Sequence, residues 1–286
     1  MITAVPSADT VGRVVDDETT GTSRRRALWL LGAVAGLALA ADEVRPRHGY
    51  RTAQADVVPA SPAVDPAPTP HPTLRPASWT PGRLAALEDP VRELTQLSPP
   101  PPAKTIALTI DDGPHPEWTP RMLDLLAEHD VRATFFIIGE QVAEHRALTR
   151  RIADAGHQIC NHTMHHPLSM GGLSAREVRE EVVEAHDRIA DATGVLPGYF
   201  RAPGGNWTER VMDVIAEYGM LPIDWSIDPR DWSRPGAGRV RDRLLEAGDG
   251  DILLCHDGGG DRSQTIKGLR KAIPVLKRRG LTFATL

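Results

Sequence analysis

The stretch TIALTIDDGP (residues 105–114) gives the first indication of the fold. Its first six residues are mostly β-branched or apolar, which is typical of a buried strand, and Asp111 and Asp112 follow directly. Two adjacent carboxylates repel each other, so we expect a nearby cation to stabilise them. A strand that ends in such a pair indicates a site at the carboxyl ends of parallel strands.

Short β-rich runs alternate with helical patterns from residue 104 to the end of the chain. This alternation predicts an α/β fold whose parallel sheet closes into a barrel or stays open and doubly wound. One helix has clear signals at both ends, because Ser174 and Glu177 form a capping box and Gly194 ends the pattern. Seven strands are predicted, at residues 105–110, 133–139, 157–160, 197–200, 221–226, 251–255 and 281–285.

The composition restricts the class of function. The chain has 286 residues, enough for one domain of ordinary size after its flanking segments are set aside. It carries 33 basic and 38 acidic residues, and the resulting net charge of -5 is mild. We therefore expect no nucleic-acid partner.

The amino terminus (1–41) has the features of an export signal. The basic stretch SRRR (23–26) precedes the apolar run ALWLLGAVAGLALAA (27–41), which ends in small residues. The Ser-Arg-Arg start resembles a twin-arginine signal. Because the run is shorter than the roughly 20 residues that span a bilayer, we expect no stable membrane span and a secreted or cell-wall-associated protein. An uncleaved membrane anchor is the alternative.

Residues 42–102 are predicted to be a linker, because Pro, Ala and Ser dominate much of this segment. Within it, RLAALEDPVRELTQL (83–97) could form a short amphipathic helix interrupted by Pro90. The remaining residues, 103–286, are the predicted catalytic domain.

Chemically reactive residues follow several of the predicted strands. Because the carboxyl ends of strands converge on one face of a βα barrel, these side chains should form one site. They are Asp111 and Asp112 after the first strand, His162 and His166 after the third, Arg201 after the fourth, Asp231 beyond the fifth and His256 after the sixth.

Three of these residues fit a metal site. His162 and His166 are four residues apart, so one helical turn would point both imidazoles in the same direction. Together with Asp112 they would leave coordination positions open for water and substrate. Asp111 could then stay ionised beside the metal as a general base. His165 is spaced to point elsewhere. The alternatives to a metal site are a loop whose histidines have no ligand role and an aspartate pair that caps the following turn.

The segments TIDDGP, HTMHHP, RAPGG, DWSIDPRDW and LLCHD resemble, in order and spacing, the five motifs of polysaccharide deacetylases with the NodB homology domain, carbohydrate esterase family 4. The resemblance covers residues 103–286. It implies a deformed (β/α)7 barrel with a divalent ion on Asp112, His162 and His166; we expect Zn²⁺ ahead of Co²⁺ or Ni²⁺.

The same resemblance implies the roles of four further residues. Asp111 would be the catalytic base and His256 the catalytic acid. Arg201 would hold the base, and Asp231 would be the partner of the acid. The alternatives are a surface ion pair for Arg201, a helix cap for Asp231 and a satisfied loop histidine for His256.

Aromatic and small residues suggest where substrate would bind. Trp232 and Leu254 match the family's wall around the acetyl methyl group. Gly204 replaces a frequent Tyr, but its backbone N–H could still bind the oxyanion. Trp207 could stack on a sugar or pack internally, and we expect Trp225 in the core.

The two cysteines, Cys160 and Cys255, have opposite places in the alternation of their strands. Cys160 should share the face of His162, whereas Cys255 immediately precedes His256 and should face the helices. We expect no disulfide between them.

The predicted function is that of an exported, metal-dependent deacetylase that hydrolyses N-acetyl groups of chitin oligomers or peptidoglycan. Its partner would be an acetylated polysaccharide, and we expect a monomer. Acetylxylan O-deacetylation is a close alternative. An inactive sugar-binding module and a non-haem iron oxygenase are the alternatives from other classes.

Overall fold

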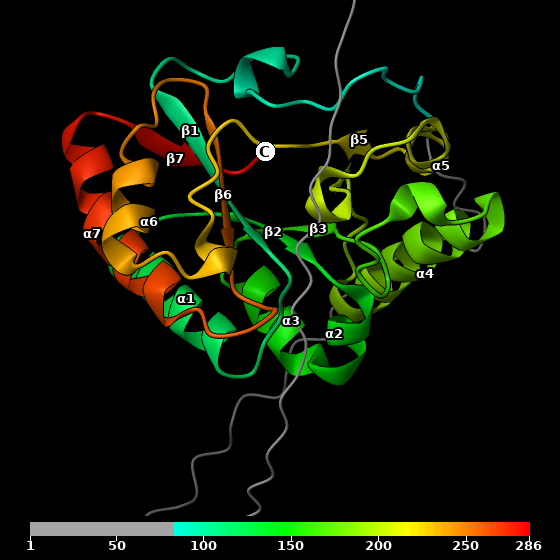
Figure 1. Cartoon of the computed structure of the whole chain (residues 1–286), viewed down its shortest axis with the longest axis horizontal. Coiled ribbons are helices and arrows are strands. Elements are labelled where there is room, and N and C mark those ends of the chain that lie inside the picture. The colour runs from blue at the N-terminus through cyan, green and yellow to red at the C-terminus, as the bar shows by residue number, and fades with distance from the viewer. Residues whose placement is uncertain (1–82) are drawn as a thin grey trace, which may run out of the picture. The chain divides into compact units, whose positions relative to one another are not determined.

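The computed structural model of the protein describes residues 83–286 (Figure 1). The predicted export signal (1–41) and residues 42–82 of the predicted linker lie outside the described residues. Within the described part of the chain, no helix has the length and apolar character that a membrane crossing requires.

The sheet is built from parallel strands in the order β5-β4-β3-β2-β1-β6, and β7 pairs with the first part of β1. All seven residues of β1 are buried, as expected for a central strand covered on both faces. A strand occurs in each predicted segment, which confirms the α/β fold. The strands are β1 (Thr105–Asp111), β2 (Thr134–Ile137), β3 (Gln158–Asn161), β4 (Tyr199–Phe200), β5 (Leu221–Pro222), β6 (Ile252–His256) and β7 (Thr282–Ala284).

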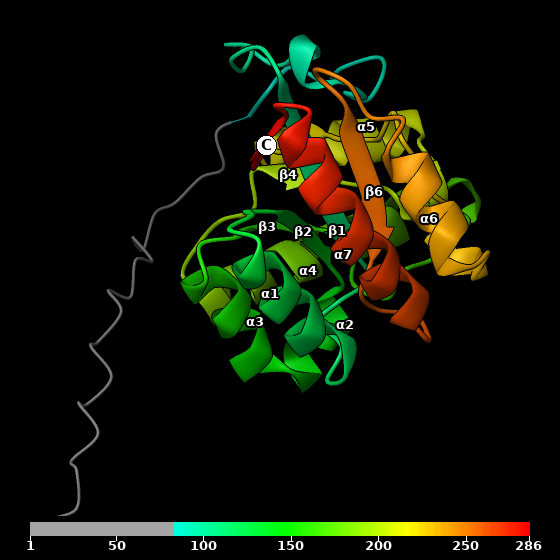
Figure 2. The same cartoon turned by 90° about the vertical axis from the view of Figure 1, so that its left-hand side faces the viewer.

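Helices cover the outer side of the curled sheet. Each of α6, α7, α1, α3, α4 and α5 packs on the next in this order (Figures 1 and 2). At the start of α4, Ser174 Oγ accepts a hydrogen bond from the backbone N–H of Glu177. The Glu177 carboxylate in turn accepts one from the backbone N–H of Ser174, so the predicted capping box is confirmed. The helices are α1 (Trp118–Glu128), α2 (Gly139–Glu144), α3 (Arg146–Asp154), α4 (Ala175–Thr193), α5 (Glu209–Glu217), α6 (Ala237–Leu244) and α7 (Ser263–Arg278).

The segment before β1 bridges the two edges of the sheet (Figure 1). Among the described residues, β5 and β6 share no ladder; instead Val91 bridges to Ile223 and Glu93 bridges to Asp251. The backbone of Val91 accepts from Asp224 N (2.7 Å), so the chain after β5 pairs with this segment and β5 is shorter than predicted. These contacts complete a deformed barrel.

The short helix predicted within residues 83–97 is wrong. Only η1 (Leu94–Gln96) is helical, and the residues around Val91 are extended because their backbone groups pair with strand residues. Val91 and Leu94 are buried with apolar side chains inside the barrel. Residues 91–97 therefore pack on the sheet, although their sequence suggested a linker.

Apolar clusters on different sides of the sheet contain the two cysteines. Cys255 packs among residues of the outer helices, and Cys160 lies in the inner cluster with Phe136 and Ile223. Both are free and buried. Their separation agrees with the expected alternation along β3 and β6.

Replacement of Leu94 by Ala should destabilise the domain by about 2–5 kcal/mol, because it leaves a cavity where the segment closes the barrel. Leu94 is 2% exposed, whereas Leu87 in the same segment is 39% exposed, so Leu87→Ala is the matched control. Urea unfolding followed by tryptophan fluorescence measures both changes. Equal effects of the two substitutions would contradict the closing role of the segment.

Candidate active site

Two loops with close backbone packing hold the aspartate pair. Asp111 ends β1 and is buried, and Asp112 follows with a left-handed φ of +75°. A Cβ on Gly258 would collide with the carbonyl of Asp112, and one on Gly113 would collide with the carboxylate of Asp257. The loop after β1 therefore fits against the loop after β6 only because glycine occupies these positions.

The three predicted metal ligands come together. Ligand atoms of Asp112, His162 and His166 all lie within 4.8 Å of one another. Asp112 Oδ1 is 3.5 Å from His162 Nε2 and 3.1 Å from His166 Nε2. This oxygen is buried, and it has no hydrogen-bond partner of normal geometry in residues 83–286. An orphaned carboxylate oxygen that faces two imidazoles fits a divalent cation, because a cation would satisfy all three donors.

His162 is oriented by a second contact. Its Nδ1 lies 2.8 Å from the carbonyl oxygen of Arg201, so Nδ1 donates and Nε2 is left free toward Asp112. Metal-binding histidines commonly have such a carbonyl partner on their other nitrogen. The ring orientation therefore supports a ligand role for Nε2.

The charges of the cluster support each other. Burial raises the pKa of Asp112, but the facing imidazoles of His162 and His166 outweigh burial and hold this pKa well below its usual range. Burial lowers the pKa of His166, but Asp112 outweighs that effect, and the pKa is raised. Protons and a cation therefore compete for the His166 imidazole, which makes the affinity for a cation dependent on pH.

Arg201 is completely buried beside Asp111. Its Nη1 donates to Asp111 Oδ1 (2.8 Å) and to Thr109 Oγ1 (2.7 Å), and Nη2 donates to the carbonyl of Asp224 (2.8 Å). The guanidinium also lies 4.1 Å from the ring centroid of Phe136. A surface ion pair is excluded, since the side chain is 0% exposed.

His256 and Asp231 form a second buried pair. The carboxylate of Asp231 lies 2.7 Å from His256 Nδ1 and accepts from His256 N (2.9 Å) and Thr265 Oγ1 (2.8 Å). Burial lowers the pKa of His256, but Asp231 outweighs burial and raises this pKa to about 9. The carboxylate oxygens are therefore used by His256 and Thr265, and not as a helix cap.

The predicted substrate residues differ in how open they are. Trp232 is 48% exposed, whereas Leu254 is buried in β6. Gly204 in η3 (Pro203–Gly205) has a left-handed φ of +60°, and a Cβ there would meet only Leu168 Cδ2, at 3.9 Å. Trp207 packs edge-on against Phe200, with ring centroids 6.0 Å apart, which favours packing over stacking on sugar.

Trp225 has the packing role expected from the sequence. It is partly buried and packs against the inner cluster of the barrel, and its ring lies 5.5 Å from the guanidinium of Arg201.

The sequence did not reveal several supporting residues. Asp257 is fully buried, accepts from Thr119 Oγ1 (2.5 Å), and has a pKa raised to about 7 by burial. Glu181 on α4 accepts from the backbone N–H of His165 and lies 2.9 Å from its ring, which anchors the loop of His166. Asp257 directly follows His256, and this position could have indicated its supporting role from the sequence. Glu181 lies on the face of a long helix, where no sequence pattern indicates such a role.

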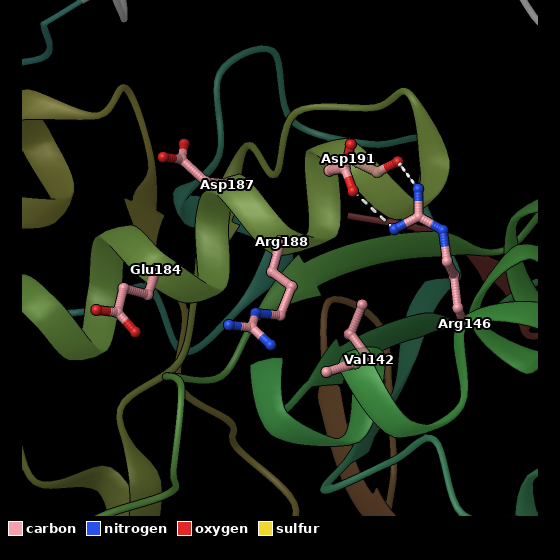
Figure 3. A pocket seen from close by; sticks show the side chains of 7 residues that line it. Val142, Arg146, Glu184, Asp187, Arg188 and Asp191 are labelled. Atoms are coloured by element: carbon pink, nitrogen blue, oxygen red, sulfur yellow. Dashed lines mark hydrogen bonds and ion pairs between the residues drawn. The ribbon is translucent and has the colours of Figure 1, made fainter.

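A separate pocket lies on the helical side, between α2, α3 and α4 (Figure 3). An ion pair of Arg146 with Asp191 (2.7 Å) spans one end of it. Arg188, Glu184 and Asp187 add charges of both signs, and no predicted site residue lines this pocket. We assign it no part in the chemistry.

Comparisons with known proteins identify the family of the chain. The model of the polysaccharide deacetylase family matches residues 98–223. The chitooligosaccharide deacetylase of Bradyrhizobium sp. (strain ANU 289) is 43% identical over 196 residues, which are 64% of this chain and 89% of that protein.

Solved structures give the same result. The Bc1960 peptidoglycan N-acetylglucosamine deacetylase is similar with a TM-score of 0.62 and 34% identity, over 64% of this chain and 86% of that one. A family 4 carbohydrate esterase from Streptomyces lividans, in complex with acetate, has a TM-score of 0.60 and 29% identity, over 63% of this chain and 91% of that one. The chain has a deformed parallel barrel, and it covers 89% of a relative to which it is 43% identical. It therefore belongs to the polysaccharide deacetylase family, carbohydrate esterase family 4.

Proposed function

We propose that the protein is an exported, metal-dependent deacetylase that hydrolyses N-acetyl groups of N-acetylglucosamine-containing glycans. The observation that carries the proposal is the convergence of two buried charge pairs and one Asp-His-His cluster at the carboxyl ends of the strands. The first charge pair joins Asp111, the proposed general base, to Arg201. The second joins His256, the proposed general acid, to Asp231.

Asp111 is the general base in this proposal. Its Oδ1 pairs with the buried guanidinium of Arg201 at 2.8 Å, and the second carboxylate oxygen, Oδ2, lies 3.7 Å from His162 Nε2. This oxygen is therefore beside the ligand cluster, where it can accept a proton from the attacking water.

Asp112, His162 and His166 would hold the metal ion. A divalent ion, which we expect to be Zn²⁺, supplies Lewis-acid polarisation of the acetyl carbonyl and makes a water molecule more acidic. The side chains of Asp112 and His166 are 12% and 26% exposed, so the cluster can be reached from solvent.

His256 is the general acid. Its hydrogen bond to Asp231 fixes Nδ1, so Nε2 is the nitrogen that can donate a proton to the departing amine. Its raised pKa keeps the imidazole protonated at neutral pH, as the acid role requires. The products would be acetate and a free amino sugar, and exposed Trp232 with Leu254 would flank the acetyl methyl group.

Relatives named for chitooligosaccharide and for peptidoglycan leave two N-acetylated substrates open. Acetylxylan remains an alternative, because the same attack cleaves an ester. An iron oxygenase would have no use for the His256–Asp231 pair. A sugar-binding module would need neither the buried base nor the acid. We retain export as a proposal on the strength of the sequence of residues 1–41.

The metal-loaded protein should release acetate from chitooligosaccharide or peptidoglycan, and Asp111→Asn should lower kcat/KM by about 100-fold or more, because the general base is lost. Asp124→Asn is the control, since Asp124 lies on α1 with its side chain 71% exposed. Divalent-ion binding should persist in Asp111→Asn. Absence of acetate from every substrate, with an ion bound, would refute the deacetylase proposal.

Asp231→Asn should move the alkaline limb of the pH profile of kcat/KM to lower pH. The folded pKa of His256 is raised, so the protonated acid is present at neutral pH and is lost as pH rises through that value; without the Asp231 charge, burial lowers the pKa. Thr265→Val leaves the charge in place and should shift the limb less. An unmoved limb would show that another group controls it.

Gly258→Ala should weaken divalent-ion binding by about 10- to 100-fold, because the new methyl group displaces the backbone of Asp112. Isothermal titration with Zn²⁺ measures this. Gly238→Ala is the control, as a Cβ there meets nothing within 4 Å. Wild-type affinity in Gly258→Ala would mean that Asp112 is not a ligand.

A further inference from the structure

Arg230 and Trp232 lie together at the exposed rim of the active site. The guanidinium carbon of Arg230 is 5.2 Å from the centroid of the Trp232 ring. Between them in the chain, Asp231 is buried and holds His256. Arg230 and Trp232 are therefore the residues immediately before and after Asp231, the partner of the proposed acid.

The backbone presents Arg230 in a strained conformation. Arg230 and Arg234 flank η4 (Asp231–Ser233) with left-handed φ values of 53° and 56°, a conformation that non-glycine residues rarely adopt. Arg230 N donates to Asp228 Oδ1 (2.6 Å), and Ser233 Oγ donates to the carbonyl of Arg230 (2.8 Å). These bonds keep the segment rigid, so the side chain leaves the backbone at a fixed point and direction.

The two flanking arginines differ in their partners. Arg234 pairs with Asp261 at 3.7 Å. The guanidinium of Arg230 makes no hydrogen bond or ion pair with any of the residues 83–286, and its contact is the face of Trp232. A guanidinium whose contact is an aromatic ring keeps its N–H groups available, and this planar fork of N–H groups can bind a carboxylate in a bidentate manner.

We propose that Arg230 binds a carboxylate on the sugar next to the N-acetylglucosamine that is deacetylated, and that the substrate is an anionic glycan in preference to neutral chitooligosaccharide. This inference rests on the proposed function. Two sources share the chemistry: the lactyl carboxylate of muramic acid, which is free in peptidoglycan strands that carry no stem peptide, and the carboxyl group of a uronic acid.

Four oligosaccharides of matched length test the proposal. They are chitooligosaccharide, a peptide-free muramic acid fragment, the same fragment with its lactyl carboxyl reduced to an alcohol, and an alternating glucuronic acid and N-acetylglucosamine oligomer. We expect kcat/KM for at least one carboxylate substrate to exceed that for its neutral counterpart by about 3- to 10-fold, as for an exposed charge pair with good geometry.

Arg230→Gln should abolish this preference, so that the ratio of kcat/KM for a carboxylate substrate to that for its neutral counterpart, both measured with this variant, falls to about 1. Rising salt should reduce the preference in the wild type. Arg230→Lys should keep part of it, since charge remains but the planar fork is lost. Arg234→Gln is the matched control and should leave the preference intact. Preference for the muramic or for the glucuronic substrate identifies the source of the carboxylate.

Equal kcat/KM on charged and neutral substrates, or a preference that survives in Arg230→Gln, would overturn the inference while leaving deacetylation intact. A protein that releases no acetate would refute the proposed function instead. In that case, calorimetry still decides whether Arg230 recognises the carboxylate. It compares the affinity of the Asp111→Asn variant for the carboxylate fragment with its affinity for the reduced fragment, with and without the additional Arg230→Gln substitution.

Discussion

The buried guanidinium of Arg201 is the interaction on which the rest of the site depends. A buried cation is stable only when its charge and its donors are compensated, and loss of one partner is costly. Asp111 supplies the charge, while Thr109 and the carbonyls of Ile223 and Asp224 accept three further N–H groups. These partners come from β1 and from the chain around β5. The curled sheet must therefore bring its centre and its edge around one side chain.

Arg201 also connects the two halves of the chemistry. Its side chain binds Asp111, and its backbone carbonyl orients His162. Alternation along a strand would point Asp111 and Asp112 to opposite faces. The left-handed φ of Asp112 breaks this alternation and lets both carboxylates approach the His162 ring, at 3.7 and 3.5 Å. The pair is useful because one carboxylate meets a guanidinium and the other meets two imidazoles.

The sequence was sufficient for the seven strands and for the ionisable residues that meet at the site. β1 and β6 are apolar runs that end in Asp111 and His256, so the strand and its reactive residue are read from one local pattern. The closing segment could not be found in this way. Val91 pairs with residues near 223, more than a hundred positions away, and its local pattern resembles a helix. Thr265 and Glu181 lie on helices, where no sequence signal separates a supporting residue from a solvated one.

Burial of the two proposed catalytic pairs has a consequence for specificity. Asp111, Arg201 and Asp231 are enclosed by protein, so they can act on an acetyl group but cannot distinguish the glycans that carry it. Discrimination must come from exposed residues around them. Gly204 has no side chain, and its nearest neighbour is Leu168, which is 69% exposed and whose Cδ2 lies 3.9 Å from where a Cβ would be. In the proposed site, exposed Leu168 on the loop after His166 would therefore wall the side of Gly204, and the segment around Trp232 would recognise charge. Separate loops would thus set shape and charge, and they could change without disturbing the buried pairs.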